Sequence, residues 1–129
     1  MDEIDRFFNA SCFAVAGASE DRSKYGNIVF RSLLDAGLST LPVNPSRELI
    51  EGHRCIPSVE LARPQVESLS VVTQPAITLQ IVRQAITCQV KNIWMQPGSQ
   101  CENAAKEARA AGLTVIDDGR CILVELARR

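Results

Sequence analysis

Basic runs, paired cysteines and long apolar stretches are all missing from this 129-residue chain. Lysine and arginine total 14 against 15 aspartates and glutamates, and basic side chains are scattered, so no electrostatic footprint for nucleic acid or anionic lipid is present. No segment approaches the roughly 20 apolar residues that a membrane span requires. We therefore expect neither nucleic-acid binding nor membrane binding.

Cysteine usage and the N-terminus point to an intracellular chain without disulfides. The five cysteines are odd in number and widely spaced, with no C-x-x-C pair, which argues against a disulfide framework or a zinc site. The opening MDEIDRFFNAS is acidic and lacks the basic-then-apolar order of a signal peptide. We expect a cytoplasmic protein in which most cysteines are small buried apolar residues.

Short apolar runs alternate with stretches of helical periodicity along the whole chain. Residues 12–17, CFAVAG, are apolar throughout, which is typical of a strand buried on both faces. Pro42 favours a frayed or terminal position for the second strand over pairing in mid-sheet. Residues 44–65 read as loop with a short strand near 55–56 and a helical turn over 58–62. Strands are predicted over 12–17, 39–43, 68–73, 92–96 and 113–117, and helices over 26–36, 76–88 and 100–111.

This order predicts one domain, residues 1–129, with an α/β Rossmann-like three-layer fold. The sheet is expected to be mostly parallel, with about five strands and helices on both faces. Ligands of such folds bind at the carboxyl ends of the strands, where the strand order reverses. Small, polar or proline-bearing segments follow four predicted strands: GAS (17–19), NPSR (44–47), TQP (73–75) and QPG (96–98).

The segment after the first strand is suited to phosphate. Gly17 and Ala18 remove side-chain bulk so that backbone N–H groups can approach an anion, and Ser19 adds a hydroxyl donor before a helix N-terminus. Gly17 alone is equally typical of a tight turn that binds nothing. The four loops together favour a binding site.

A nicotinamide dinucleotide fits this site poorly. The chain has G-A-S in place of G-x-G-x-x-G, and residues 40–47, TLPVNPSR, contain no acid to bind a ribose diol. Arg47 lies there instead, and a guanidinium suits a phosphate on the ribose. A solvated surface arginine is the commoner interpretation of such a residue taken singly.

Several motifs together resemble one family, the small stand-alone CoA-binding proteins, and more distantly the CoA-binding N-terminal domain of the succinyl-CoA synthetase α subunit. The resemblance covers nearly the whole chain, with the pieces in the family's order. They are VAGAS (15–19), Lys24, Gly26, PVNP (42–45), Gly52, WMQPG (94–98) and RCILVE (120–125).

The resemblance implies CoA or an acyl-CoA as the ligand. Its pyrophosphate would lie on Gly17, Ala18 and Ser19, with Lys24 close to this loop in the same motif. The remaining implied contacts are Asn44 and Pro45 beside the adenosine, Arg47 near the 3′-phosphate, Thr73 and Pro75 beside the nucleotide, Gln96, Pro97 and Gly98 along the pantetheine arm, and Cys121 near the thiol.

Catalytic residues are sparse, so we expect a non-catalytic sensor, carrier or regulatory subunit. His53 is the single histidine and lies in a loop-rich stretch, and Asp117-Asp118-Gly119 is typical of a turn before it is typical of an acid/base pair. The synthetase relatives use a phosphorylated histidine from a second domain and a partner subunit, so we do not expect the complete ligase reaction from these residues.

Cys121 has two interpretations. It begins the apolar run CILVEL, as a buried inert cysteine would, but it also follows Arg120, whose charge favours thiolate at an exposed site. One hypothesis is that Cys121 forms a mixed disulfide with CoA under oxidation. Trp94, the one tryptophan, is expected to pack against a helix and to report on the adjoining loop.

Two other functions stay open from the residues alone. One is a nicotinamide-dependent oxidoreductase or redox sensor, and the other is a protein-interaction subunit whose nucleotide site is vestigial. A homodimer or a regulatory protein partner is compatible with each of them.

Overall fold

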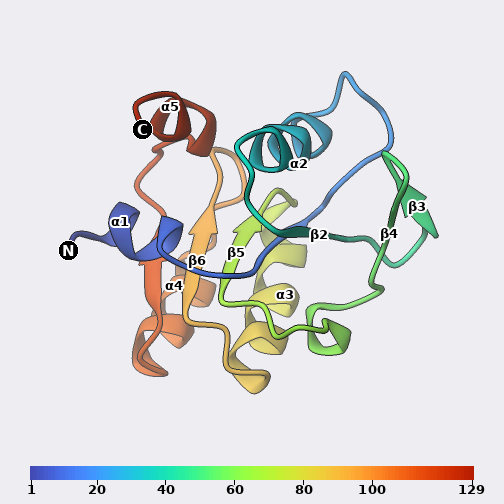
Figure 1. Cartoon of the computed structure of the whole chain (residues 1–129). Coiled ribbons are helices and arrows are strands. Elements are labelled where there is room, and N and C mark those ends of the chain that lie inside the picture. The colour runs from blue at the N-terminus through green and yellow to red at the C-terminus, as the bar shows by residue number, and fades with distance from the viewer.

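The computed structural model describes all residues from Met1 to Arg129 and contains a five-stranded sheet with every neighbouring pair parallel. The strand order is β2-β1-β5-β6-β7 (Figure 1). The strands are β1 (Phe13–Ala16), β2 (Thr40–Val43), β5 (Ser68–Val71), β6 (Asn92–Met95) and β7 (Thr114–Ile116). The predicted α/β fold and its parallel sheet are confirmed.

The helices cover both faces of this sheet. Helix α2 (Tyr25–Asp35) connects β1 to β2 on one side of it in the sheet. Helices α3 (Pro75–Thr87) and α4 (Glu102–Ala110) connect β5 to β6 and β6 to β7, in the opposite direction across the sheet. Right-handed crossovers in opposite directions place α2 on one face and α3 and α4 on the other, as Figure 1 shows. The strand order therefore reverses between β1 and β5, and a crevice forms at their carboxyl ends.

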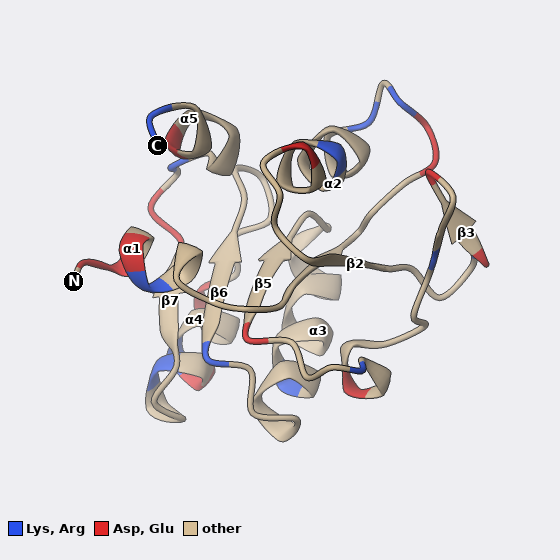
Figure 2. Ribbon diagram, viewed as in Figure 1, with Lys and Arg blue, Asp and Glu red and all other residues tan.

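The core is divided by the sheet because successive strand side chains point to opposite faces. Ala14 and Ala16 contribute to the cluster under α3 and α4, whereas Phe13 and Val15 contribute to the cluster under α2. The second cluster also contains buried residues of α1 (Glu3–Phe8) and α5 (Ile122–Ala127). The sheet strands carry no charged side chains in Figure 2, and acidic and basic residues are interspersed around them.

Three elements differ from the sequence prediction. Helices α1 and α5 were not predicted, although Ile4, Phe7 and Phe8 have helical spacing and are buried. The segment between β2 and β5 contains an antiparallel hairpin, β3 (Leu49–Ile50) and β4 (His53–Arg54), rather than a strand near 55–56. Ile56 makes only an isolated bridge with Val43.

Two other details agree with the sequence. β2, which contains Pro42, is an edge strand, where the missing N–H costs least. The predicted helical turn is a 3₁₀-helix, η1 (Val59–Leu61). None of the helices combines the length and the apolar character that crossing a bilayer requires.

Candidate functional site

The turn after β1 passes so close to two other backbones that it excludes side chains. Gly17 has φ +90°, and a Cβ there would lie 1.9 Å from the carbonyl oxygen of Val72, just beyond β5. Gly26, in the first turn of α2, is equally constrained, since its Cβ would lie 2.0 Å from the Gly17 carbonyl oxygen. Gly17 and Gly26 are therefore both required by packing at the crevice.

This turn presents backbone donors. The carbonyl oxygens of Ala18 and Ser19 accept hydrogen bonds from the side-chain amides of Asn44 (2.9 Å) and Asn27 (2.7 Å). The N–H groups of Ala18 and Ser19 have no acceptor within the protein. Two free N–H groups next to the N-terminus of an 11-residue helix make this turn suitable for an anion.

A groove runs along the carboxyl ends of the strands on both sides of Gly17. Its central pocket, about 370 Å³, is lined by Gly17, Asn44 and Thr73 among others. A pocket of about 590 Å³ shares Thr73 with it and continues toward Pro97, Gly98 and Cys121. A third pocket of about 370 Å³ shares Asn44 with the centre and contains Arg47. The shared residues make the three pockets one groove of the size that small-molecule ligands occupy.

Most of the residues predicted for the site meet in this groove. Eight line it directly: Gly17, Asn44, Pro45, Arg47, Thr73, Pro97, Gly98 and Cys121. Ala18 and Ser19 continue the turn from Gly17, with the Ala18 side chain buried and the Ser19 hydroxyl accepting from the Asp21 N–H at 3.1 Å.

Besides Ala18 and Ser19, three predicted residues do not line it. Lys24 is the exposed N-cap of α2, and Pro75 is the exposed first residue of α3, where a proline loses no helical hydrogen bond. Gln96 is fully buried beneath the groove.

Gln96 joins three elements below the large pocket. Its Oε1 accepts hydrogen bonds from the Ile122 N–H (2.9 Å) and the Tyr25 hydroxyl (3.2 Å), and its Nε2 donates to Ser70 Oγ (3.1 Å). The Tyr25 hydroxyl also lies 2.6 Å from Cys121 Sγ. Burial, and then the hydrogen bond with Cys121, raises the pKa of Tyr25, so its hydroxyl stays protonated.

Ion pairing fixes the β3–β4 hairpin over the turn after β1. Glu51 sits at the hairpin turn and accepts two hydrogen bonds from Arg22 (2.8 and 3.1 Å) and one from Asn27 (3.0 Å). These donors lower the pKa of Glu51 to about 2, with Arg22 the larger cause. Because the Asn27 side-chain amide also donates a hydrogen bond to the Ser19 carbonyl oxygen, Asn27 links the hairpin to the turn after β1.

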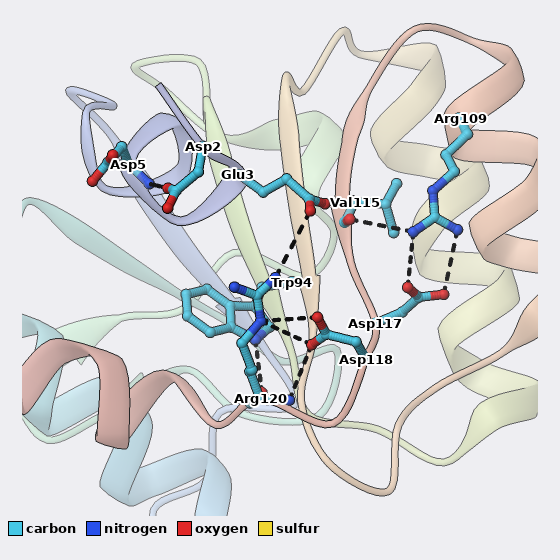
Figure 3. A network of polar contacts seen from close by, with 9 residues as sticks. All are labelled: Asp2, Glu3, Asp5, Trp94, Arg109, Val115, Asp117, Asp118 and Arg120. Atoms are coloured by element: carbon cyan, nitrogen blue, oxygen red, sulfur yellow. Dashed lines mark hydrogen bonds and ion pairs between the residues drawn. The ribbon is translucent and has the colours of Figure 1, made fainter.

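Arginines engage both carboxylates of the Asp117-Asp118-Gly119 turn. Figure 3 shows that Arg109 pairs with Asp117 at 2.8 Å and that Arg120 pairs with Asp118 at 2.9 Å. The Arg120 hydrogen bond lowers the pKa of Asp118. Asp118 also accepts from the Arg120 N–H at 3.2 Å, as the Asp-Asp-Gly turn predicts.

Trp94 and His53 also have packing roles. The Trp94 ring is fully buried and makes edge contacts with Phe7 and Phe8 of α1, which confirms the expected helix contact. Its Nε1 donates to the Arg120 carbonyl at 2.9 Å (Figure 3). His53 lies on the exposed hairpin with its ring against Phe30.

Sequence reasoning missed many residues that line the groove, four of which bear on its chemistry. Tyr25, Gln74 and Ser99 line the large pocket, and Arg54 lines the pocket that contains Arg47. Gln74 and Ser99 directly adjoin predicted loop residues, which was a usable signal. Tyr25 and Arg54 lie on a helix and a hairpin whose orientation the sequence did not reveal.

Comparisons with known proteins agree with this geometry. The family described as the CoA binding domain matches residues 11–127. ADP-forming acetate–CoA ligase I of Archaeoglobus fulgidus is 34% identical over 73 residues, which are 57% of this chain and 10% of the ligase. The chain thus spans about a tenth of that relative's length.

Two solved structures are similar over most of the chain. A conserved hypothetical protein from Pyrococcus furiosus has a TM-score of 0.84 and 37% identity, covering 90% of this chain and 99% of that one. The dinucleotide-forming acetyl-coenzyme A synthetase 1 of Ca. Korarchaeum cryptofilum, solved with phosphate and ADP, has a TM-score of 0.76 and 28% identity, covering 89% of this chain and 27% of that one. The family match spans the sheet, the Gly17 turn and the groove, and the chain belongs to the CoA-binding domain family.

Proposed function

We propose that this protein binds CoA or an acyl-CoA in the groove along the carboxyl ends of its strands. The observation that carries the proposal is the pair of free N–H groups of Ala18 and Ser19, which directly follow Gly17 in the central pocket of a groove that ends at Arg47 on one side and Cys121 on the other. The chemical groups of CoA follow the same order along the molecule: a phosphate on the ribose, then the pyrophosphate, then the arm that ends in the thiol.

The same residues disfavour a nicotinamide dinucleotide. After β2 the chain continues with Asn44 and Pro45, and the Asn44 amide is engaged with the Ala18 carbonyl. No carboxylate follows β2 directly, where a dinucleotide fold has its ribose-binding acid, and the first one in the chain, Glu48, comes after Arg47. The nearby Arg47 instead favours a phosphorylated ribose.

The ligand is proposed to be held rather than transformed. No histidine or carboxylate lines the large pocket, and its ionisable side chains are those of Tyr25 and Cys121. General acid–base chemistry needs a group that exchanges protons near neutral pH, and the raised pKa of Tyr25 removes it from that range. A sensor, carrier or regulatory subunit fits this composition.

Thermal unfolding with CoA, acetyl-CoA, dephospho-CoA, NAD and NADH side by side tests the proposal. A ligand at 100 times its dissociation constant adds about 2.7 kcal/mol, which raises the unfolding midpoint on the order of 10 °C for a domain of this size. We expect a rise with CoA or acetyl-CoA and none with NAD or NADH. A rise only with a nicotinamide nucleotide would reverse the ligand assignment, and no rise with any ligand would favour a vestigial site.

A further inference from the structure

The end of the groove at Cys121 contains a nucleophile that ligand binding alone does not use. Cys121 is half-buried, and it is the one cysteine that lines the large pocket. The Tyr25 hydroxyl lies 2.6 Å from its sulfur, and Tyr25 also lines this pocket. A protonated hydroxyl beside a thiol can donate a hydrogen bond to the thiolate, which is the form of cysteine that attacks electrophiles. The pocket therefore contains a sulfur nucleophile with a donor for its charged form.

A second group in this pocket, the Ser99 hydroxyl, has a proton to donate. Ser99 lines the pocket and is 3% exposed, so its hydroxyl is shielded from bulk water. Its Oγ accepts a hydrogen bond from the Thr73 N–H at 3.0 Å, and its own proton has no acceptor within the protein. Buried polar groups are normally paired, so this unpaired donor indicates an acceptor on a ligand in the pocket.

Three hydrogen bonds hold Ser99 in place. Its N–H donates to the Gln96 carbonyl at 2.8 Å, and the Thr78 hydroxyl of α3 donates to the Ser99 carbonyl at 2.8 Å. Together with the Thr73 contact, these bonds connect the loop after β6 to the loop after β5 and to α3. A donor held in this way does not have to be reordered when negative charge develops beside it, as stabilisation of an oxyanion requires.

Cys121 and Ser99 together meet the needs of thioester exchange. An acyl-CoA with its pyrophosphate at the Gly17 turn and its arm along the groove would have its thioester in the large pocket. Attack of the Cys121 thiolate on the carbonyl carbon moves negative charge to the carbonyl oxygen, where a hydroxyl donor is stabilising. Because a thiolate enters and a thiolate leaves, the exchange needs no histidine or carboxylate, and the lack of these groups in the pocket does not prevent it.

We propose that Cys121 accepts the acyl group of a bound acyl-CoA, with Ser99 donating to the carbonyl oxygen, so that the chain itself carries the acyl group as a thioester. This inference rests on the proposed function and goes beyond it. A bond forms between Cys121 Sγ and the carbonyl carbon, the bond from that carbon to the CoA sulfur breaks, and CoA leaves as a thiolate with the electron pair. The proton given up by Cys121 is taken up by the released CoA, so no other reactant is consumed.

Incubation with acetyl-CoA and a phosphine reductant tests the inference, because disulfides do not persist under these conditions. Acetyl-CoA is the probe since its acyl group is uncharged and no charged side chain lines the pocket. Intact-mass spectrometry should show one added acetyl group on wild type and on Cys88→Ser, a change to a half-buried cysteine outside the groove, but none on Cys121→Ser. Neutral hydroxylamine should remove the group, as it cleaves thioesters and leaves acetylated lysines intact.

Two further measurements distinguish this site from chance acetylation of a thiol. Excess CoA should take the acetyl group back from the acetylated protein, because one thioester is exchanged for another. Ser99→Ala should slow acetylation about 10-fold or more, since a hydrogen bond to a charged oxygen is lost. Ser32→Ala, on α2 away from the pocket, should leave the rate unchanged. Thermal unfolding of each variant with acetyl-CoA verifies that it folds and binds.

The outcomes separate this inference from the proposed function. Binding of acetyl-CoA without transfer, or equal acetylation of wild type and Cys121→Ser, would overturn the inference and leave the proposed function standing. An unchanged rate in Ser99→Ala would overturn the role of Ser99. Absence of wild-type binding to both CoA and acetyl-CoA would overturn the inference and the proposed function together.

Discussion

The Tyr25 hydroxyl lies 2.6 Å from Cys121 Sγ, although the two residues are 96 positions apart in the chain. The Tyr25 hydroxyl also donates a hydrogen bond to Gln96 Oε1. When the thiol is neutral, the Cys121 S–H therefore donates to the Tyr25 oxygen. When the thiol ionises, the same hydroxyl can rotate to donate to the sulfur. Gln96 Oε1 keeps the Ile122 N–H in either arrangement. The large pocket therefore has on its wall a thiol with an adjacent hydrogen-bond donor for its charged form.

Incubation with CoA disulfide is expected to add one CoA to Cys121. The thiolate would attack one sulfur of the disulfide, forming the protein–CoA disulfide and releasing one CoA thiolate. Intact-mass spectrometry should show the adduct on wild type and on Cys88→Ser, because Cys88 ends α3 outside the groove, but not on Cys121→Ser. The same adduct on Cys121→Ser would refute the assignment.

Tyr25→Phe should slow this reaction without removing the thiol. Loss of a hydrogen bond to a charged group costs about 1.5–3 kcal/mol, so adduct formation should slow about tenfold or more. The adduct is followed by mass over time, with thermal unfolding run alongside to verify the fold. An unchanged rate would mean that Tyr25 has only a packing role.

Gly17→Ala should destabilise the protein far more than Gly112→Ala. Both glycines have positive φ, +90° and +88°, so each substitution costs about 1–2 kcal/mol for backbone conformation alone. Only at Gly17 would the new Cβ also meet a backbone oxygen at 1.9 Å, whereas the space around Gly112 is open. Overpacking adds about 1–3 kcal/mol or more, which urea denaturation of the two variants would measure. Equal losses would contradict the close contact with Val72.

Glu51→Gln should lower stability at neutral pH and make less difference in acid. The pKa of Glu51 is lowered from 4.5 to about 2 in the folded protein, so its ionised form contributes stability above pH 4.5. That contribution is lost as the pH falls toward 2. Unfolding midpoints of wild type and Glu51→Gln should therefore converge between pH 5 and pH 2. A constant difference across this range would show that the charge of Glu51 does not matter.

The fluorescence of Trp94, which lies in β6, should respond to ligand binding. Its Nε1 donates to the Arg120 carbonyl, and the next residue, Cys121, lines the large pocket. A ligand that contacts Cys121 perturbs this hydrogen bond. The fluorescence emission of Trp94 should therefore change as CoA is added and level off once the site is filled. Since the chain has a single tryptophan, the signal has one source. A signal that never saturates would indicate non-specific quenching.

The sheet and its three crossover helices could be predicted because their signals are local. Residues 12–17 are apolar throughout, and β1 is buried along its whole length between two helical layers. The Gly17 turn followed from the same pattern, since the segment after a buried strand meets a helix N-terminus at the ligand edge. Helix α1 also has a local signal, because Ile4, Phe7 and Phe8 have helical spacing and could have predicted it.

The hairpin and α5 carried weaker signals. In α5 the run ILVEL is too uniformly apolar to show a helical period. Glu51-Gly52 forms the two-residue turn with φ +50° and +78°, and a glutamate is uncommon in the left-handed region. The Arg22 and Asn27 contacts that stabilise Glu51 there come from a segment more than 20 residues away.

The sequence by itself determined the fold class, the glycine turn, the position of Arg47 and the family, because these depend on residue type and order along the chain. Tertiary structure alone decided that Gln96 is buried beneath the groove, that Tyr25 meets Cys121, and that Arg54 joins Arg47. Each of these depends on how a helix or hairpin packs against residues that are distant in the sequence. Strand register and helix packing set that position, and no pattern within a short window encodes it.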